Sequence, residues 1–191
     1  MNAAHRIALS CILTALLVPG IGIAEQIPDP ELREVLRTAA NAADSFPERY
    51  DAEVWLTDMS RRLQRQVGDT DERIDILLRV HFEATRVGLQ PELVLAVIEV
   101  ESNFDRFAVS VAGALGLMQI MPFWLDEIGR QDDNLLHVDT NLRYGCAILK
   151  FYLDKENGDL RRALGRYNGS VGKRHYPNKV IDRLSRKWFK A

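Results

Sequence analysis

Cysteine and histidine are scarce in this chain, which limits the kinds of site it can build. Its 191 residues include two cysteines and four histidines. Two cysteines cannot form the several bridges that hold a disulfide scaffold together, and no cysteine or histidine cluster has metal-ligand spacing. We therefore expect no metal and no cofactor. Cys146 lies in an apolar helical stretch, where a free cysteine is most often a small core residue.

A strong charge of one sign is also absent. The 25 basic residues stand against 27 acidic residues, which leaves a net charge of −2 at pH 7. A domain that binds nucleic acid normally carries a marked positive excess, so nucleic acid is not an expected partner. Hydrophobic residues make up 47% and charged residues 27% of the chain. These values are ordinary for a globular domain that buries a core.

Long apolar runs are missing apart from one at the N-terminus. That run extends from Ile7 to Val18, and a Pro-Gly pair and small residues at positions 22 and 24 follow it. It is shorter than the roughly 20 residues that cross a bilayer, and the pattern is typical of a cleaved secretory signal. Residues 1–24 are therefore predicted to be a signal peptide, which implies a periplasmic protein with no stable membrane insertion after cleavage. An uncleaved anchor and lipid attachment at Cys11 are the alternatives.

Charge is distributed unevenly along the rest of the chain. Residues 25–60 hold nine acidic and three basic residues, whereas residues 161–191 hold ten basic residues and one acidic residue, Asp182. Solvated helix faces account for such runs in many proteins. The alternative is that the basic end faces an anionic polymer.

Apolar residues recur at helical spacing through most of the remaining sequence, and no alternating strand of useful length is present. Residues 103–121 are rich in glycine and other small residues and are expected to form a loop with short turns. The fold class is therefore predicted as mainly α, a single domain with an N-terminal helical extension. The expected helices span residues 51–66, 70–88, 92–102, 139–153, 159–168 and 177–189.

Glu101 is the acidic residue whose position favours chemistry. On the expected helix 92–102 it shares a face with Val94, Val97 and Ile98, so its carboxyl should be partly desolvated. Burial and the nearby C-terminal end of the helix dipole both raise the pKa of a carboxyl. A raised pKa suits a general acid near neutral pH. From spacing alone, an ordinary exposed glutamate at a helix end remains an equally serious interpretation.

Residues 101–122 contain the pattern E-S-x-F-x3-A-x-S-x2-G-A-x-G-L-M-Q-I-M-P with every specified position present. Asp139-Thr140-Asn141-Leu142 and Tyr167-Asn168-Gly169 follow at suitable distances. Together these segments closely resemble the soluble lytic transglycosylase family, which has a lysozyme-like fold. The resemblance covers roughly residues 73–184. It implies a catalytic domain at residues 71–191, preceded by the extension at residues 25–70.

The resemblance implies an enzyme that cleaves the β-1,4 bond between N-acetylmuramic acid and N-acetylglucosamine in peptidoglycan glycan strands. Glu101 would be the single acid/base: it would protonate the glycosidic oxygen and then deprotonate the C6 hydroxyl of the same muramic residue. That hydroxyl closes a 1,6-anhydro ring. An intramolecular nucleophile explains why the second carboxylate of ordinary glycosidases is not required.

The resemblance also implies a set of substrate-binding residues. Gln119 would donate to the sugar, Tyr167 would contact the catalytic glutamate, and Asn168 would bind saccharide. Ser102 has an equally good interpretation as a cap of its helix, and Met118 alone would be assigned to the core. Arg166 and Ser170 stand where the family has small residues, which puts the nearby subsite in doubt. The implied set is Ser102, Ser110, Met118, Gln119, Tyr167 and Asn168.

Two other function classes fit the same sequence. A goose-type, lysozyme-like hydrolase would use the same glutamate but leave a reducing end, and a non-catalytic wall-binding or secretion-assembly module would retain only the fold. The sequence does not separate general wall turnover from service to a trans-envelope secretion machine. We expect a monomer.

Overall fold

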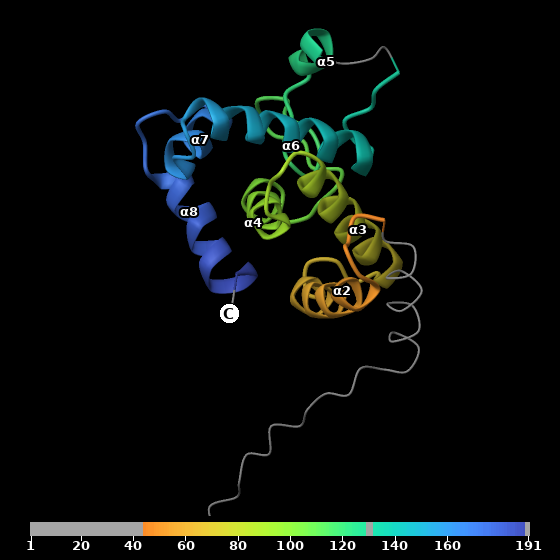
Figure 1. Cartoon of the computed structure of the whole chain (residues 1–191). Helices are drawn as coiled ribbons and strands as arrows, with labels where there is room; N and C mark the ends of the chain where they lie inside the picture. Colours follow the sequence, from red (N-terminus) through yellow and green to blue (C-terminus); the bar gives the residue numbers. More distant parts are fainter. Residues whose placement is uncertain (1–43, 129–131, 190–191) are drawn as a thin grey trace, which may run out of the picture.

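The computed structural model describes residues 44–128 and 132–189, and helices make up most of them (Figure 1). No strand occurs in these two ranges, which hold only isolated bridges of Leu115 with Val109 and Ile120. The prediction of a mainly α fold is confirmed. The predicted signal peptide lies outside the described residues. The helices are α2 (Arg49–Leu63), α3 (Thr70–Arg86), α4 (Pro91–Glu101), α5 (Phe123–Ile128), α6 (Val138–Lys155), α7 (Leu160–Tyr167) and α8 (His175–Arg183), followed by the π-helix η1 (Leu184–Trp188).

Helix ends follow local capping chemistry where the sequence supplies it. The Asp69 carboxylate accepts from the Glu72 backbone N–H at the start of α3, and Asp159 accepts from the Arg162 N–H at the start of α7. Pro91 occupies the first turn of α4, where its missing N–H costs nothing. The helix expected at residues 139–153 begins one residue earlier, because α6 begins at Val138, and the helix expected from residue 177 begins two residues earlier, at His175. The short helix α5 was not predicted.

Helix α4 lies at the centre of the domain. Its residues from Leu93 to Ile98 are all buried, as expected for a helix that is apolar on nearly every face. Helices α3 and α8 and the π-helix η1 pack against it. Figure 1 shows α4 almost end-on between α3 and α8, with α6 running across above it in this view. Glu101 is the last residue of α4 and therefore stands where the central helix leaves the core.

The part of the N-terminal extension that the structure describes shares the core of the domain. Helix α2 packs against α3 and η1, and its Ala52, Leu56 and Leu63 side chains are fully buried. The domain boundary at residue 70 stays a prediction, but no gap in the core marks it. Cys146 is also fully buried, as predicted, and burial raises the pKa of its thiol. Among residues 44–128 and 132–189, no helix has the length and apolar character needed to cross a membrane.

Candidate active site

A cavity of about 270 Å³ opens beside the end of α4. Segments that are distant in the sequence build it: the end of α4, the loop before α5, α5 itself, α6 and the end of α7. Five of the predicted site residues line it, together with Trp124 of α5. The predicted residues are Glu101, Ser110, Gln119, Tyr167 and Asn168, of which Glu101 is the predicted acid/base.

Burial raises the pKa of the Glu101 carboxyl above its ordinary value. Two hydrogen bonds oppose this effect, because the Tyr176 hydroxyl and the Asn168 side chain both favour the charged form. Desolvation is the larger influence, so the pKa stays raised. Glu101 therefore holds its proton to a higher pH than an exposed glutamate does.

The phenol that touches Glu101 belongs to Tyr176. Its hydroxyl, carried by α8, donates to Glu101 Oε1 at 2.6 Å. Burial raises the pKa of this phenol well above its ordinary value, so Tyr176 is a neutral donor at any physiological pH. The expectation that Tyr167 makes this contact differs from the structure. The Tyr167 hydroxyl donates to the Met118 carbonyl oxygen at 2.7 Å and so ties α7 to the loop before α5.

The loop between α4 and α5 is held in shape by its own polar groups. Leu115 and Ile120 exchange two backbone hydrogen bonds of 2.9 Å, and the Ser110 hydroxyl accepts from the Ala114 N–H at 2.9 Å. Gln119, at a positive φ of 50°, donates its side-chain amide to the Ala108 and Gly116 carbonyls at 3.2 and 2.9 Å. Ser110 and Gln119 thus line the cavity and also shape its wall.

Asn141 of α6 also fixes the loop between α4 and α5. The sequence linked this residue to the family pattern only as part of the segment Asp139-Thr140-Asn141-Leu142. It is fully buried, and its Oδ1 accepts from the Met118 N–H at 2.7 Å. Its Nδ2 donates to the Leu115 and Leu135 carbonyls at 2.8 Å each. Gly116 passes so close that an added Cβ would lie 2.5 Å from Asn141 Nδ2.

Met118 and Ser102 face the protein and not the cavity. The Met118 side chain is fully buried beside Gly145, where a Cβ would lie 2.2 Å from its sulfur, so only its backbone helps to build the site. The Ser102 hydroxyl donates to the Leu117 carbonyl at 2.8 Å and to the Ile98 carbonyl at 3.3 Å. Of the two interpretations of Ser102, this geometry fits the structural one.

Glu99 is the other acidic residue near the end of α4, and it belongs to a different site. Its Oε2 accepts from the Trp188 indole N–H at 2.7 Å and lies 3.3 Å from the Lys187 ammonium nitrogen. The Arg183 Nε is 3.5 Å from Oε1. The sequence does not predict the contact between Glu99 and Trp188, because the two residues are 89 positions apart and η1 has no sequence signature. Glu99 fastens the C-terminal turn to α4.

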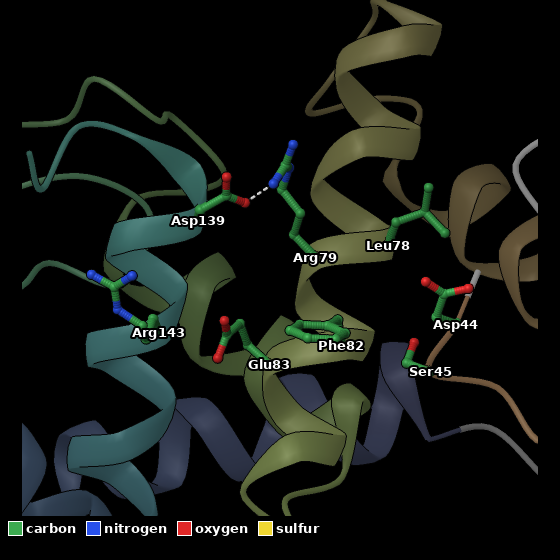
Figure 2. A pocket seen from close by; sticks show the side chains of 8 residues that line it. All are labelled: Asp44, Ser45, Leu78, Arg79, Phe82, Glu83, Asp139 and Arg143. Atoms are coloured by element: carbon green, nitrogen blue, oxygen red, sulfur yellow. Dashed lines mark ion pairs between the residues drawn. The ribbon is translucent and has the colours of Figure 1, made fainter. Parts of the chain in front are cut away.

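A second hollow, of about 330 Å³, lies between α3 and α6 (Figure 2). Most of its charged side chains are paired: Arg79 pairs with Asp139, as Figure 2 shows, Arg143 pairs with Asp133, and Glu83 pairs with Arg86. None of the predicted site residues lies there. In residues 44–128 and 132–189, no group of three or more His, Cys, Asp or Glu is placed to hold a metal.

Comparison with known proteins identifies relatives with names from one class. The sequence model of the Transglycosylase SLT domain matches residues 80–187. A transglycosylase of Enterobacteria phage PRD1 is 31% identical over 109 residues, which cover 53% of this chain and 40% of the phage protein. Membrane-bound lytic murein transglycosylase C of Haemophilus ducreyi is 30% identical over 105 residues, which cover 47% of this chain and 29% of that protein.

Among solved structures, an inactive mutant of the lytic transglycosylase Slt of Pseudomonas aeruginosa aligns with a TM-score of 0.46 and 22% identity. The alignment covers 82% of this chain and 34% of that one. The chain thus spans less than half the length of each of these three proteins.

Proposed function

This chain belongs to the Transglycosylase SLT domain family, and from that premise we propose that it is a peptidoglycan lytic transglycosylase. The bond cleaved is the β-1,4 bond between N-acetylmuramic acid and N-acetylglucosamine, and the product carries a 1,6-anhydromuramyl end. The observation that carries this proposal is the desolvated Glu101 carboxyl, which lies in the cavity with its pKa raised.

Glu101 acts first as an acid and then as a base. Its proton passes to the glycosidic oxygen as the bond to the muramic C1 breaks, which leaves a carboxylate and an oxocarbenium-like sugar. The carboxylate then takes the proton of the C6 hydroxyl as that oxygen bonds to C1. The Tyr176 hydroxyl, 2.6 Å from Glu101 Oε1, stabilises the carboxylate between the two steps.

A single carboxyl group is enough for this sequence of steps. Glu101 is the one carboxylate among the described residues that line the cavity. Glycosidases that use two carboxylates place them about 5–9.5 Å apart across the scissile bond. Glu99 cannot be the second, because Trp188, Lys187 and Arg183 occupy it. The C6 hydroxyl replaces a protein or water nucleophile, at the high effective concentration of an intramolecular group.

The remaining cavity residues bind the glycan strand. Asn168, Gln119 and Ser110 present amide and hydroxyl groups that suit N-acetyl and hydroxyl groups of sugars. Trp124 adds an aromatic ring to the same wall, and such a ring can cover the apolar face of a sugar. Met118 and Ser102 do not face the cavity; their hydrogen bonds hold the loop that forms this wall.

The location and partners follow from the proposed substrate. Residues 1–24 direct export, and the mature protein acts on periplasmic peptidoglycan without a cofactor, metal or nucleic acid. Opening the wall for a trans-envelope secretion machine is one setting for such an enzyme, and general wall turnover is another.

Mass spectrometry of fragments released from purified peptidoglycan tests the proposal. We expect anhydromuropeptides as the products of the wild-type chain. Reducing muropeptides would instead identify a goose-type hydrolase, and the absence of any released fragment would identify a non-catalytic binding module.

A further inference from the structure

A strongly basic groove lies between α2 and η1, away from the Glu101 cavity. Its volume is about 640 Å³, and five cationic side chains line it together with Asp58 and Gln66. Figure 1 shows α2 and the C-terminal end of the chain at one end of the molecule and α5, which carries Trp124, at the other. The two sites share no lining residue. The five cationic residues, here called the basic groove residues, are Arg61, Arg62, Arg65, Arg186 and Lys187.

The positive charge of this groove is only partly neutralised by the protein. Asp58 pairs with Arg62 at 2.5 Å, Asp182 pairs with Arg186 at 2.6 Å, and Glu99 lies 3.3 Å from Lys187. Arg61 and Arg65 are exposed and have no ion-pair partner in the part of the chain that the structure describes. Two guanidinium groups in one concave surface are therefore available to an anion, and Arg186, which pairs with Asp182 through Nε, is 80% exposed and can share a second anion.

The position of Lys187 gives a second sign that cations are crowded here. Its pKa is lowered, first by burial and then by the nearby charges of Arg183 and Arg65, although Glu99 opposes the change. In addition, the buried Gln66 Oε1 at the groove wall has no hydrogen-bond donor in the protein. A ligand that carries anionic groups would offset the crowded positive charge.

We propose that this groove binds the peptide stems of peptidoglycan, whose free carboxylates pair with Arg61, Arg65 and Arg186. This inference rests on the proposed function. The stems suit the groove because they carry closely spaced carboxylates together with amine donors, which complement Asp58. Guanidinium groups bind carboxylates with paired hydrogen bonds. A flat anionic membrane matches a concave surface less well.

The consequence is a second attachment point on the same polymer. A cross-linked wall presents many stems, so the groove can hold one strand while the cavity engages another. Binding at one site then raises the effective concentration of substrate at the other without any new contact in the cavity. The groove therefore affects affinity for intact wall and leaves the chemical step unchanged.

Co-sedimentation with purified sacculi tests this inference when Glu101→Gln is present in every protein, so that bound wall is not consumed. The variant Arg61→Gln/Arg65→Gln/Arg186→Gln removes three exposed charges, and we expect it to bind about 10-fold more weakly at low salt. That change corresponds to about 1.4 kcal/mol in total. The matched control Arg49→Gln/Lys150→Gln/Lys155→Gln removes three charges elsewhere and should bind like the parent.

Sacculi stripped of their stems by an amidase identify the ligand. The parent protein should lose the same factor of about 10 on stripped glycan, and the groove variant should lose nothing more. Equal binding of parent and groove variant to intact sacculi would overturn the inference. So would a groove-dependent loss that persists on stripped glycan, or groove-dependent binding to vesicles of anionic phospholipid that exceeds binding to sacculi.

Failure of this inference is distinguishable from failure of the proposed function. On peptide-free glycan fragments, the groove variant with Glu101 intact should release anhydro products at the wild-type rate. If no protein releases anhydro products, the proposed function fails, whatever the groove binds.

Discussion

The Tyr176 hydroxyl lies 2.6 Å from Glu101 Oε1, although 75 residues separate the two side chains in sequence. Helix α8 carries the phenol and α4 carries the carboxyl, and these helices pack directly against each other. The hydrogen bond lowers the pKa of Glu101 against the larger effect of burial. Packing of the C-terminal helix on the central helix therefore sets both the orientation and the acidity of the proposed acid/base.

Tyr176→Phe should weaken the enzyme and shift its pH profile. Loss of the hydrogen bond removes an interaction that favours the carboxylate, so the pKa of Glu101 should rise and the alkaline limb of activity should move to higher pH. A hydrogen bond to a charged group is worth about 1.5–3 kcal/mol, so kcat should fall about 10- to 100-fold. The pH–rate profile on purified peptidoglycan is the measurement.

Tyr167→Phe is the matched control for that experiment. Its hydroxyl donates to the Met118 carbonyl, so its loss should reduce stability or activity without moving the alkaline limb. An unchanged profile for Tyr176→Phe, or the same shift in both variants, would contradict the assigned role of Tyr176.

Glu99→Gln should destabilise the fold. The Glu99 carboxylate accepts from Trp188 and lies near Lys187 and Arg183, so the neutral amide leaves the half-buried Lys187 without its counter-charge. We expect the free energy of unfolding to fall by about 1–3 kcal/mol, measured by urea denaturation. Glu127→Gln, at an exposed position on α5, is the control and should change it by less than about 0.5 kcal/mol. Equal stability of the two variants would show that the contacts of Glu99 contribute nothing.

Asn141→Ala should damage both stability and the cavity wall. The change leaves the Met118 N–H and the Leu115 and Leu135 carbonyls without their buried partner. Each unsatisfied buried group costs about 1–3 kcal/mol, so the total loss should be at least about 3 kcal/mol. Thermal unfolding measures the stability. The affinity of the folded variant for glycan fragments shows whether the cavity wall still binds the strand. Asn178→Ala, at an exposed position, should behave like the wild type, and a similarly mild effect of Asn141→Ala would contradict this account.

Stability should depend on pH through Glu101. Its pKa is raised in the folded state, so the folded chain binds a proton more tightly than the unfolded chain does. Stability should therefore decline as pH rises from about the ordinary glutamate value of 4.5 through the raised value. Glu101→Gln should lack this decline and be more stable than the wild type at neutral pH. Parallel curves of stability against pH for the two proteins would contradict the raised pKa.

Local sequence signals predicted most of the fold. The buried residues of α4, the start of α7 at Asp159 and the glycine-rich loop all depend on residues close together in sequence, and each was predicted. Helix α5 was missed because its six residues show too little periodicity to separate from a loop. The π-helix η1 was read as a continuation of α8, since nothing in residues 184–188 distinguishes the two helix types.

The candidate site was predicted in part. Glu101 could be selected from helical spacing and a recognised pattern, and its raised pKa agrees with the desolvation argument. The partners Tyr176, Asn141 and Trp188 lie 75, 23 and 89 residues from Glu101, Met118 and Glu99, so no local pattern pairs them. The roles of Met118 and Ser102 depended on side-chain direction in an irregular loop, which sequence spacing does not specify.

The central claim is that Glu101 carries the proton in both steps, and Glu101→Gln tests it most directly. The substitution keeps the shape of the side chain and removes the transferable proton. Release of anhydromuropeptides from purified peptidoglycan should fall by at least about 10²–10⁴-fold, the usual contribution of general acid–base catalysis, while the protein stays folded and still binds sacculi. If a folded Glu101→Gln protein retains more than about a tenth of the wild-type release rate, Glu101 is not the acid/base of this enzyme.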